Sequence, residues 1–294
     1  MRVVIAGGTG FLGAALVRHL QDEGHAVTVL TRRPERRHHV RWDPNGPVTE
    51  WAHGLENADA VVNLVGAPIN ARWTAAYKQA LWNSRVNVTR SLVAAMRSVQ
   101  RIPPVLVNAS AIGIYGPRGD EPLTEASPTG SGFLADLGRA WEQEALAASP
   151  PTRVVVLRTG IVLARDGGAL PQLALPLRLF VGGPVGSGRQ YVSWIHRDDW
   201  TAMVVWALGR EAVAGPLNAT APDPATNQEL TGALGRVLHR PAFLKAPAFA
   251  VRLVLGEMAE AVLTGQRVLP EKARSLGFEF RHPRLEPALQ AIYA

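Results

Sequence analysis

The stretch that decides the fold is Val3-Val4-Ile5-Ala6-Gly7-Gly8-Thr9-Gly10-Phe11-Leu12-Gly13. Val3–Ala6 is an apolar run that predicts a buried strand, and Phe11–Glu23 has apolar residues at helical spacing up to Gly24, a residue that favours the end of a helix. Gly7, Gly10 and Gly13 stand three residues apart. The first permits a tight turn, the second lets the backbone approach a pyrophosphate, and the third lets the helix pack on the strand.

This context favours a dinucleotide-binding turn over a glycine turn that binds nothing. A strand precedes the glycines and a helix follows them, so the free N–H groups of the helix N-terminus are available to phosphate oxygens. The residues that we expect at the phosphates are Gly7, Thr9, Gly10, Phe11, Leu12 and Gly13.

The rest of the first half repeats the alternation of strand and helix. Apolar runs predict further strands at Ala26–Leu30, Asp59–Leu64, Val105–Ser110 and Arg153–Leu157. Helical patterns lie between them, near Ala75–Ser98 and Phe133–Ala148. Buried strands that alternate with helices are typical of the α/β class, here a Rossmann-type doubly wound parallel sheet.

Glycine and proline become dense after about residue 165, and helical patterns resume at 198–208, 227–238 and 248–263. A strand-like segment, 191–195, precedes them, and 218–220 offers one more short strand. We expect residues 1–165 to form the nucleotide-binding Rossmann domain, which later segments can join. Residues 166–294 are expected to form a smaller α+β substrate lobe.

The end of the second strand indicates which dinucleotide binds. It reads Val29-Leu30-Thr31-Arg32-Arg33-Pro34, without the carboxylate that normally binds the ribose hydroxyls of NAD. A guanidinium can bind a 2′-phosphate through paired hydrogen bonds. The sequence therefore predicts NADP(H), held by Thr31 and Arg32. We expect the neighbouring residues 36–39 to form a solvated loop.

Composition narrows the class of protein further. Of 294 residues, 47% are hydrophobic, which excludes general disorder, and the absence of cysteine excludes disulfides, thiolate nucleophiles and cysteine metal sites. The net charge is +7, but no aromatic ladder or helix-turn-helix pattern points to nucleic acid. The eight histidines show no metal-ligand spacing. With no apolar run of membrane-spanning length and no secretion signal, we expect a cytoplasmic protein without a membrane or metal site, in an oligomeric state left open.

Several motifs together resemble the extended short-chain dehydrogenase/reductases. These are the glycine spacing, Asn63-Leu64-Val65-Gly66, and Ser110 followed by Tyr115-Gly116. The resemblance implies that Leu64, Val65 and Gly66 lie along the cofactor and that Ser110, within one residue of alignment, is the catalytic serine.

Longer strings resemble one atypical, YfcH-like branch of these epimerase-family proteins. They are Trp42-Asp43-Pro44, Ser84-Arg85-Val86, Trp141-Glu142, Arg158–Leu163, Gly186–Gln190, Ser193–His196, Gly256–Met258, Gly265–Pro270 and Gly277–Phe280. The resemblance covers essentially the whole chain and implies a characteristic C-terminal extension over about 246–294. It also implies that Gly160 contacts the cofactor and that Arg85 stands where ordinary members have an asparagine near the nicotinamide.

The departures from the family pattern concern the proton chemistry. No Tyr-x-x-x-Lys occurs anywhere, and the aligned positions hold Leu134 and Gly138. Ser110 and Arg85 remain as candidates for residues that face the reacting end of the cofactor. We do not assign Tyr115 or His196 as the general acid.

The arginine that commonly binds a sugar-nucleotide diphosphate is replaced by Val192, with Arg189 and Arg178 as possible substitutes. We therefore expect an NADP(H)-dependent oxidoreductase or epimerase-like enzyme that acts on an unknown small molecule. The alternative is a non-catalytic NADP(H)-binding redox sensor or regulator, as the resemblance to cell-division-linked relatives suggests.

Overall fold

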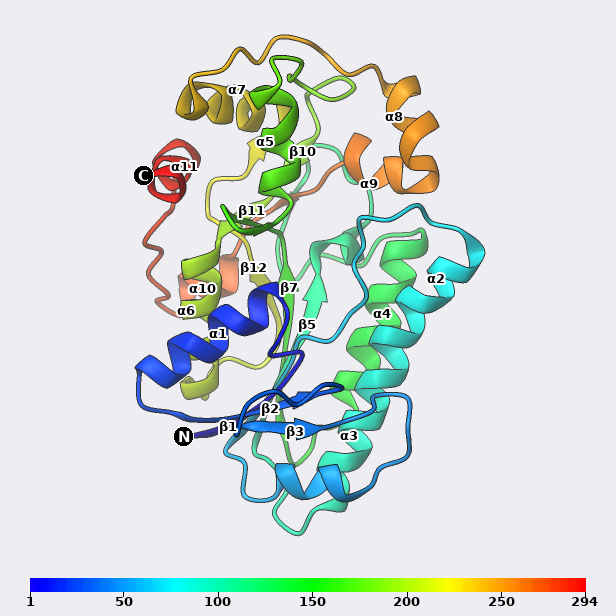
Figure 1. The fold of residues 1–294 in the computed structure, drawn as a ribbon, viewed down its shortest axis with the longest axis vertical. Helices are drawn as coiled ribbons and strands as arrows, with labels where there is room; N and C mark the ends of the chain where they lie inside the picture. The colour runs from blue at the N-terminus through cyan, green and yellow to red at the C-terminus, as the bar shows by residue number, and fades with distance from the viewer.

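The computed structural model describes all 294 residues and is built around one large sheet (Figure 1). Its seven strands are all parallel and lie in the order β12-β7-β5-β4-β1-β2-β3. Their bounds are β1 (Arg2–Ala6), β2 (Ala26–Thr31), β3 (His39–Arg41), β4 (Ala60–Asn63), β5 (Val105–Ala111), β7 (Arg153–Thr159) and β12 (Gly215–Ala219). The strand order reverses between β1 and β4, which is where ligands bind in such sheets.

Helices cover both faces of the sheet, which confirms the doubly wound prediction. One face carries α1 (Phe11–Asp22), α6 (Arg197–Gly209) and α10 (Glu271–Ser275). The other carries the 3₁₀ helix η1 (Glu50–Leu55), α3 (Val88–Ser98) and α4 (Phe133–Leu146).

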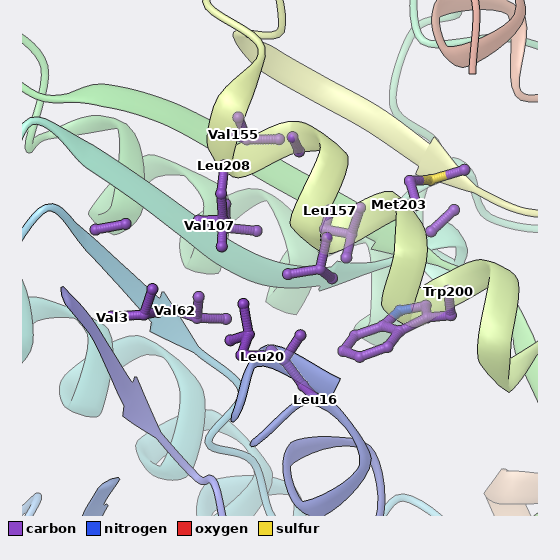
Figure 2. Packing of buried hydrophobic residues seen from close by; sticks show 14 of the residues in the cluster. Val3, Leu16, Leu20, Val62, Val107, Val155, Leu157, Trp200, Met203 and Leu208 are labelled. Carbon is purple, nitrogen blue, oxygen red and sulfur yellow. The ribbon is translucent and has the colours of Figure 1, made fainter. Parts of the chain in front are cut away.

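Alternate residues of each strand face opposite cores. Val3 of β1 packs in the cluster that contains Leu16 and Leu20 of α1 and Trp200 of α6 (Figure 2). Its neighbour Val4 packs in the second cluster, on the α3 side. Because both faces of the inner strands β1, β4, β5 and β7 are buried, these strands are mostly apolar, and their positions can therefore be predicted from the sequence.

The smaller lobe has its own core. β8 (Ile161–Ala164) pairs in parallel with β11 (Trp194–His196) and antiparallel with β9 (Gly167–Gly168), while β10 (Tyr191–Val192) pairs with β13 (Ala225–Thr226). Around Trp194 pack α5 (Leu170–Arg178), α7 (Asn227–Leu238) and α11 (Leu285–Tyr293).

The chain crosses between the two units several times after residue 165. α6, β12 and α10 all belong to the large sheet and its covering layer. The C-terminal extension contains α8 (Ala248–Leu255), the 3₁₀ turn η4 (Gly256–Met258), α9 (Ala259–Leu263) and β14 (Arg267–Val268). β14 pairs with β6 (Pro122–Leu123), so the extension returns to the first half of the chain.

Three local features differ from the sequence prediction. The helical pattern at 248–263 is divided into α8, η4 and α9. The helical pattern over Ala75–Ser98 is divided into α2 (Ala75–Trp82), a π turn η2 (Asn83–Asn87) and α3. His39, expected in a solvated loop, begins the edge strand β3. An edge strand of three residues next to solvent has no apolar run, so its sequence resembles a loop. None of the helices is both long and apolar enough to cross a bilayer.

Candidate functional site

The glycine turn lies at the reversal point between β1 and β4, and its geometry requires glycine. Gly7 has φ +84°, and a Cβ there would lie 3.0 Å from the carbonyl carbon of Leu64. A Cβ on Gly13 would lie 2.2 Å from the Gly7 oxygen, so α1 packs directly on the turn. At Gly10 the nearest neighbour would be the same oxygen at 3.4 Å, and both Thr9 and Gly10 are exposed. The turn is therefore compact on its protein side and open on the other.

The N-terminus of α1 is available to an anion. Gly10 precedes the helix, no side chain caps it, and its first turn has no acidic residue. The unpaired N–H groups and the helix dipole together favour a phosphate at this position. The residues present fit the pyrophosphate of a dinucleotide.

Arg32 follows β2 and carries a free positive charge. Thr31 shapes this turn, because its Oγ1 accepts a hydrogen bond from the Arg33 backbone N–H at 3.2 Å. The Arg32 side chain is exposed and forms no salt bridge. An unpaired guanidinium at this strand end fits the 2′-phosphate of NADP(H).

A buried network around Asn63 holds the Leu64–Gly66 segment. The Asn63 amide nitrogen donates to Thr89 Oγ1 at 2.9 Å and to Asn108 Oδ1 at 2.7 Å. Its oxygen accepts from the Val65 N–H at 3.2 Å. The fully buried amide therefore fixes the segment that leaves β4 towards the glycine turn.

Arg85 lies against this same segment. A Cβ on Gly66 would lie 3.1 Å from its guanidinium carbon. Arg85 donates to the backbone oxygens of Ala67 at 3.0 Å and Leu81 at 3.3 Å, and its guanidinium lies 5.3 Å from the Trp141 ring centroid. Burial lowers the pKa of Arg85 to about 10. The structure thus brings Arg85 to Gly66, a residue that the family resemblance implies lies along the cofactor.

Phe11 and Gly160 lie beside the smaller lobe. The Phe11 ring packs so closely on β9 that a Cβ on Gly167 would lie 2.4 Å from it, and Arg197 lies over the ring at 5.6 Å from its centroid. At Gly160, a Cβ would lie 2.4 Å from the Ser193 oxygen. Both residues therefore join the Rossmann sheet to the second lobe.

Ser110 is placed in a buried ion-pair network. Its side chain is 3% exposed, and its hydroxyl donates to Glu142 Oε1 at 2.6 Å. The next residue, Ala111, is exposed at the end of β5 but has no hydroxyl. Because its proton is already donated to a carboxylate, the geometry of Ser110 favours a positioning role over the catalytic role that the sequence suggested.

The hydroxyl of Tyr115 is likewise occupied by hydrogen bonds to buried partners. Its hydroxyl donates to Asn218 Oδ1 at 2.7 Å and accepts from Arg158 Nη1 at 2.9 Å, and the residue is fully buried. Burial raises the pKa of this phenol, although Arg158 opposes the effect. Tyr115 is therefore not positioned to give a proton to a substrate.

Leu134 and Gly138, which stand at the positions of the usual tyrosine and lysine, pack against a neighbouring turn. The turn η3 (Ile112–Tyr115) lies directly on α4. A Cβ on Gly138 would lie 3.0 Å from Ile114 Cβ, and one on Gly113 would lie 3.3 Å from Leu134 Cβ. This close contact between η3 and α4 accounts for the small residue at 138.

His196 caps a helix, and sequence spacing did not reveal its partner. Its Nδ1 accepts from the Asp198 N–H at 3.1 Å, and its ring stacks on His282 with centroids 3.9 Å apart. Ligand atoms of these two histidines and Asp198 lie within 4.8 Å of one another. The stacked rings and the occupied Nδ1 lone pair describe a structural contact. His282 is so distant in sequence that no local pattern indicates this pairing.

A large cavity of about 1230 Å³ lies in the second lobe and extension. Arg189, Gln190 and Tyr191 line it, together with Lys245 of the extension. Of the two substitutes for a diphosphate-binding arginine, Arg189 thus faces the cavity, whereas Arg178 lies over the Tyr293 ring.

Comparisons with known proteins agree with this architecture. Residues 3–218 match the NAD dependent epimerase/dehydratase family, and residues 246–292 match a domain of unknown function, DUF1731. The chain is 40% identical over 300 residues to "Epimerase family protein SDR39U1 homolog, chloroplastic" of Arabidopsis thaliana, covering 99% of this chain and 86% of the relative. It is 39% identical over 297 residues to "Epimerase family protein SA0724" of Staphylococcus aureus, covering 98% of each chain.

A solved structure is similar over its full length. It is the human epimerase family protein SDR39U1 (isoform2) with NADPH, which shares 36% identity and a TM-score of 0.91 and covers 100% of this chain and 99% of its own. With the glycine turn, the strand order and the extension all in place, the chain belongs to the NAD dependent epimerase/dehydratase family.

Proposed function

We propose that this protein binds NADP(H) and acts as an oxidoreductase or epimerase-like enzyme on a small molecule. The observation that carries the cofactor choice is the exposed, unpaired Arg32 at the end of β2. A carboxylate at that position would repel a 2′-phosphate, whereas a guanidinium attracts it. The similar human protein crystallised with NADPH supports the same choice. A cytoplasmic location stays a prediction.

Each element of the site has one task in this proposal. The glycine turn and the α1 N-terminus bind the pyrophosphate, and Arg32 binds the 2′-phosphate. Leu64–Gly66 lies along the dinucleotide, with Arg85 at its far end. Bound NADPH supplies a hydride to the substrate. The chain itself orients the reactants and stabilises the charge that develops on the substrate.

Arg85 is the residue best suited to stabilise that charge. Its two Nη atoms donate to two backbone oxygens and to Ser84 Oγ, and its Nε–H forms no hydrogen bond within the protein. A pKa of about 10 still leaves the guanidinium protonated at neutral pH, so it acts as a hydrogen-bond donor and not as a proton source. We infer that Arg85 polarises a substrate carbonyl and that the proton comes from solvent.

A second candidate function rests on the observation that no side chain of the site is positioned to donate a proton. Ser110 and Tyr115 are committed to buried partners, and Leu134 and Gly138 cannot titrate. A protein that binds NADP(H) without turnover, as a redox sensor, needs no positioned acid. It is the alternative to the enzyme.

Label transfer distinguishes the two. NADPH carrying deuterium at its transferable position is incubated with the protein and a panel of aldehydes, ketones and keto sugars. The enzyme proposal predicts deuterium in an alcohol product, and at least 10-fold less in Arg85→Met at unchanged NADPH affinity. Arg90→Met, which removes an exposed arginine of the next helix, is the matched control. Tight NADPH binding without transfer to any member of the panel supports the sensor.

A further inference from the structure

The C-terminal extension contains a hairpin of two short helices that is barely buried. It consists of α8, the turn η4 at its tip and α9, drawn in orange in Figure 1. Within residues 248–263 only Ala259 is buried, and α8 has no buried residue at all. Short helices with so little burial are not stabilised by a core of their own. The position of the α8–α9 hairpin therefore depends on the contacts of its two ends and of its tip.

Both ends of this hairpin are attached to the smaller lobe. Before α8, Ala246 forms a parallel bridge with Val185, and its N–H donates to the Pro184 oxygen at 3.0 Å. After α9, Gly265 packs directly on the backbone of β10, where a Cβ would lie 2.1 Å from the Tyr191 oxygen. The ends are therefore fixed, and the tip extends from them towards the first half of the chain.

At the tip, η4 contacts α2 and the segment before it. Glu257 forms an ion pair with Lys78 of α2, and the Lys78 ammonium lies 5.5 Å from the ring centroid of Phe133, the first residue of α4. Gly256 has φ +61°, and a Cβ there would lie 3.2 Å from Arg72 Nε. The turn therefore lies beside the N-terminus of α4, where Leu134 stands at the position of the usual tyrosine.

Met258, the last residue of η4, joins the apolar cluster at the reacting end. The buried residues of this cluster are Trp73, Leu81, Val86, Leu137 and Trp141. The Trp141 ring lies under the Arg85 guanidinium, and Leu134 packs on the same cluster as Met258 does. Met258 and Leu134 are both only partly buried, so each keeps surface that a substrate can contact. The extension thus reaches the place where Arg85 and the aligned tyrosine position lie.

We propose that η4 forms one wall of the substrate pocket at the reacting end. Met258 limits the size of the substrate group that fits beside Arg85, and the ion pair of Glu257 with Lys78 positions the turn. Because Phe133, Leu134 and Met258 offer apolar surface, the substrate is a carbonyl compound with an apolar group next to the carbonyl. The inference rests on the proposed function in one respect, namely that Arg85 marks the reacting end.

Thiol labelling of NADPH-loaded protein tests the position of the turn without turnover. The chain has no cysteine, so an introduced thiol reports on one site. The thiol of Met258→Cys should react with a maleimide at least about 5-fold more slowly than that of Leu253→Cys, because Leu253 of α8 is 77% exposed. Adding Glu257→Gln should accelerate the reaction at position 258 by about 2- to 5-fold, since the ion pair is lost, and leave the reaction at 253 unchanged.

Glu260→Gln is the matched control for that change. Glu260 is an exposed carboxylate of α9 that forms no ion pair, so its substitution should alter neither labelling rate. A labelling rate at position 258 that Glu257→Gln leaves unchanged, or that Glu260→Gln raises equally, overturns the positioning role of the ion pair.

A substrate series tests the role of Met258 in specificity. Deuterium transfer from labelled NADPH is measured with methyl ketones and aldehydes of increasing alkyl chain length. Met258→Ala should raise kcat/KM for long members relative to short ones by about 10-fold, and Met258→Phe should lower that ratio, because space is added or removed. Leu253→Ala, on the exposed side of α8, should leave the ratio unchanged. NADPH affinity should be the same in all these variants.

The outcomes separate this inference from the proposed function. Transfer with the same chain-length preference in wild type, Met258→Ala and Met258→Phe overturns the inference and leaves the proposed function in place. Absence of transfer by wild type to every member would contradict the proposed enzyme and, with it, the substrate pocket of which η4 is a wall.

Discussion

Glu142 of α4 and Arg158 of β7 form a buried two-contact ion pair, with Nε–Oε1 and Nη2–Oε2 both at 2.8 Å. Their side chains are 7% and 6% exposed. Ser110 of β5 donates to the same carboxylate. Burial alone would lower the pKa of Arg158, but its hydrogen bonds to Glu142 raise it above the ordinary value. The pair therefore ties two strand ends and a helix together beside the proposed site.

Removing one partner of this pair should destabilise the fold strongly. Glu142→Ala leaves a buried guanidinium without its counter-charge, and we expect the free energy of unfolding to fall by about 3–5 kcal/mol. Denaturant unfolding measures it. Glu144→Ala is the control, because its partner Arg90 is 61% exposed and that change should cost about 1 kcal/mol or less. Equal losses of unfolding free energy in the two variants would show that the buried pair stabilises the fold no more than the exposed pair does.

Gly13→Ala should separate α1 from the glycine turn. The new methyl group would lie 2.2 Å from the Gly7 oxygen, so backbone must move. We expect a loss of stability of about 1–3 kcal/mol and at least 10-fold weaker NADPH binding. Gly232→Ala, in α7, meets only the Arg236 side chain at 3.6 Å and should raise stability by about 0.5–1 kcal/mol. A Gly13→Ala protein with unchanged NADPH affinity would argue against the proposed phosphate site.

The pH dependence of stability should include a contribution from His196. Burial and the facing His282 lower its pKa from the ordinary 6.5, although Asp198 and Asp199 oppose the shift and Arg197 adds to it. The unfolded chain therefore binds the proton more readily, and stability falls as the pH drops below about 6.5 towards the folded-state pKa.

His196→Asn isolates that contribution. Asparagine retains a side-chain oxygen that can cap α6 but does not titrate. We expect a shallower dependence of the unfolding midpoint on pH between about 6.5 and the folded-state pKa. An identical dependence in wild type and variant would assign the acid sensitivity to other groups.

The parts of the fold that the sequence predicts are those with strong local patterns. β1, β2, β4, β5 and β7 are buried on both faces and read as apolar runs. The edge strand β3 is basic and short, and β12, Gly215–Ala219, contains glycine, proline and asparagine. Edge strands have less burial to impose an apolar pattern, so their positions depend on tertiary contacts.

The residues of the site also divide into those that local sequence patterns predict and those that depend on tertiary contacts. The glycine turn and Arg32 follow from patterns within the first strand-helix-strand unit, and each comes at the end of one of the two paired strands β1 and β2. The hydrogen bond of Ser110 to Glu142 and the stacking of His196 on His282 join residues far apart in the chain. No local pattern encodes such pairs, because each depends on how separate elements pack.

The central claim is that Arg32 selects NADP(H), and titration of wild type and Arg32→Asp with NADPH and NADH tests it most directly. Wild type should prefer NADPH. Arg32→Asp should lose about 10- to 100-fold in NADPH affinity because it replaces attraction with repulsion, and it should bind NADH at least as well as wild type. Arg37→Asp, a change of the same charge in the following loop, should leave the preference intact. Equal binding of both cofactors by wild type, or equal losses for both in Arg32→Asp, would contradict the account.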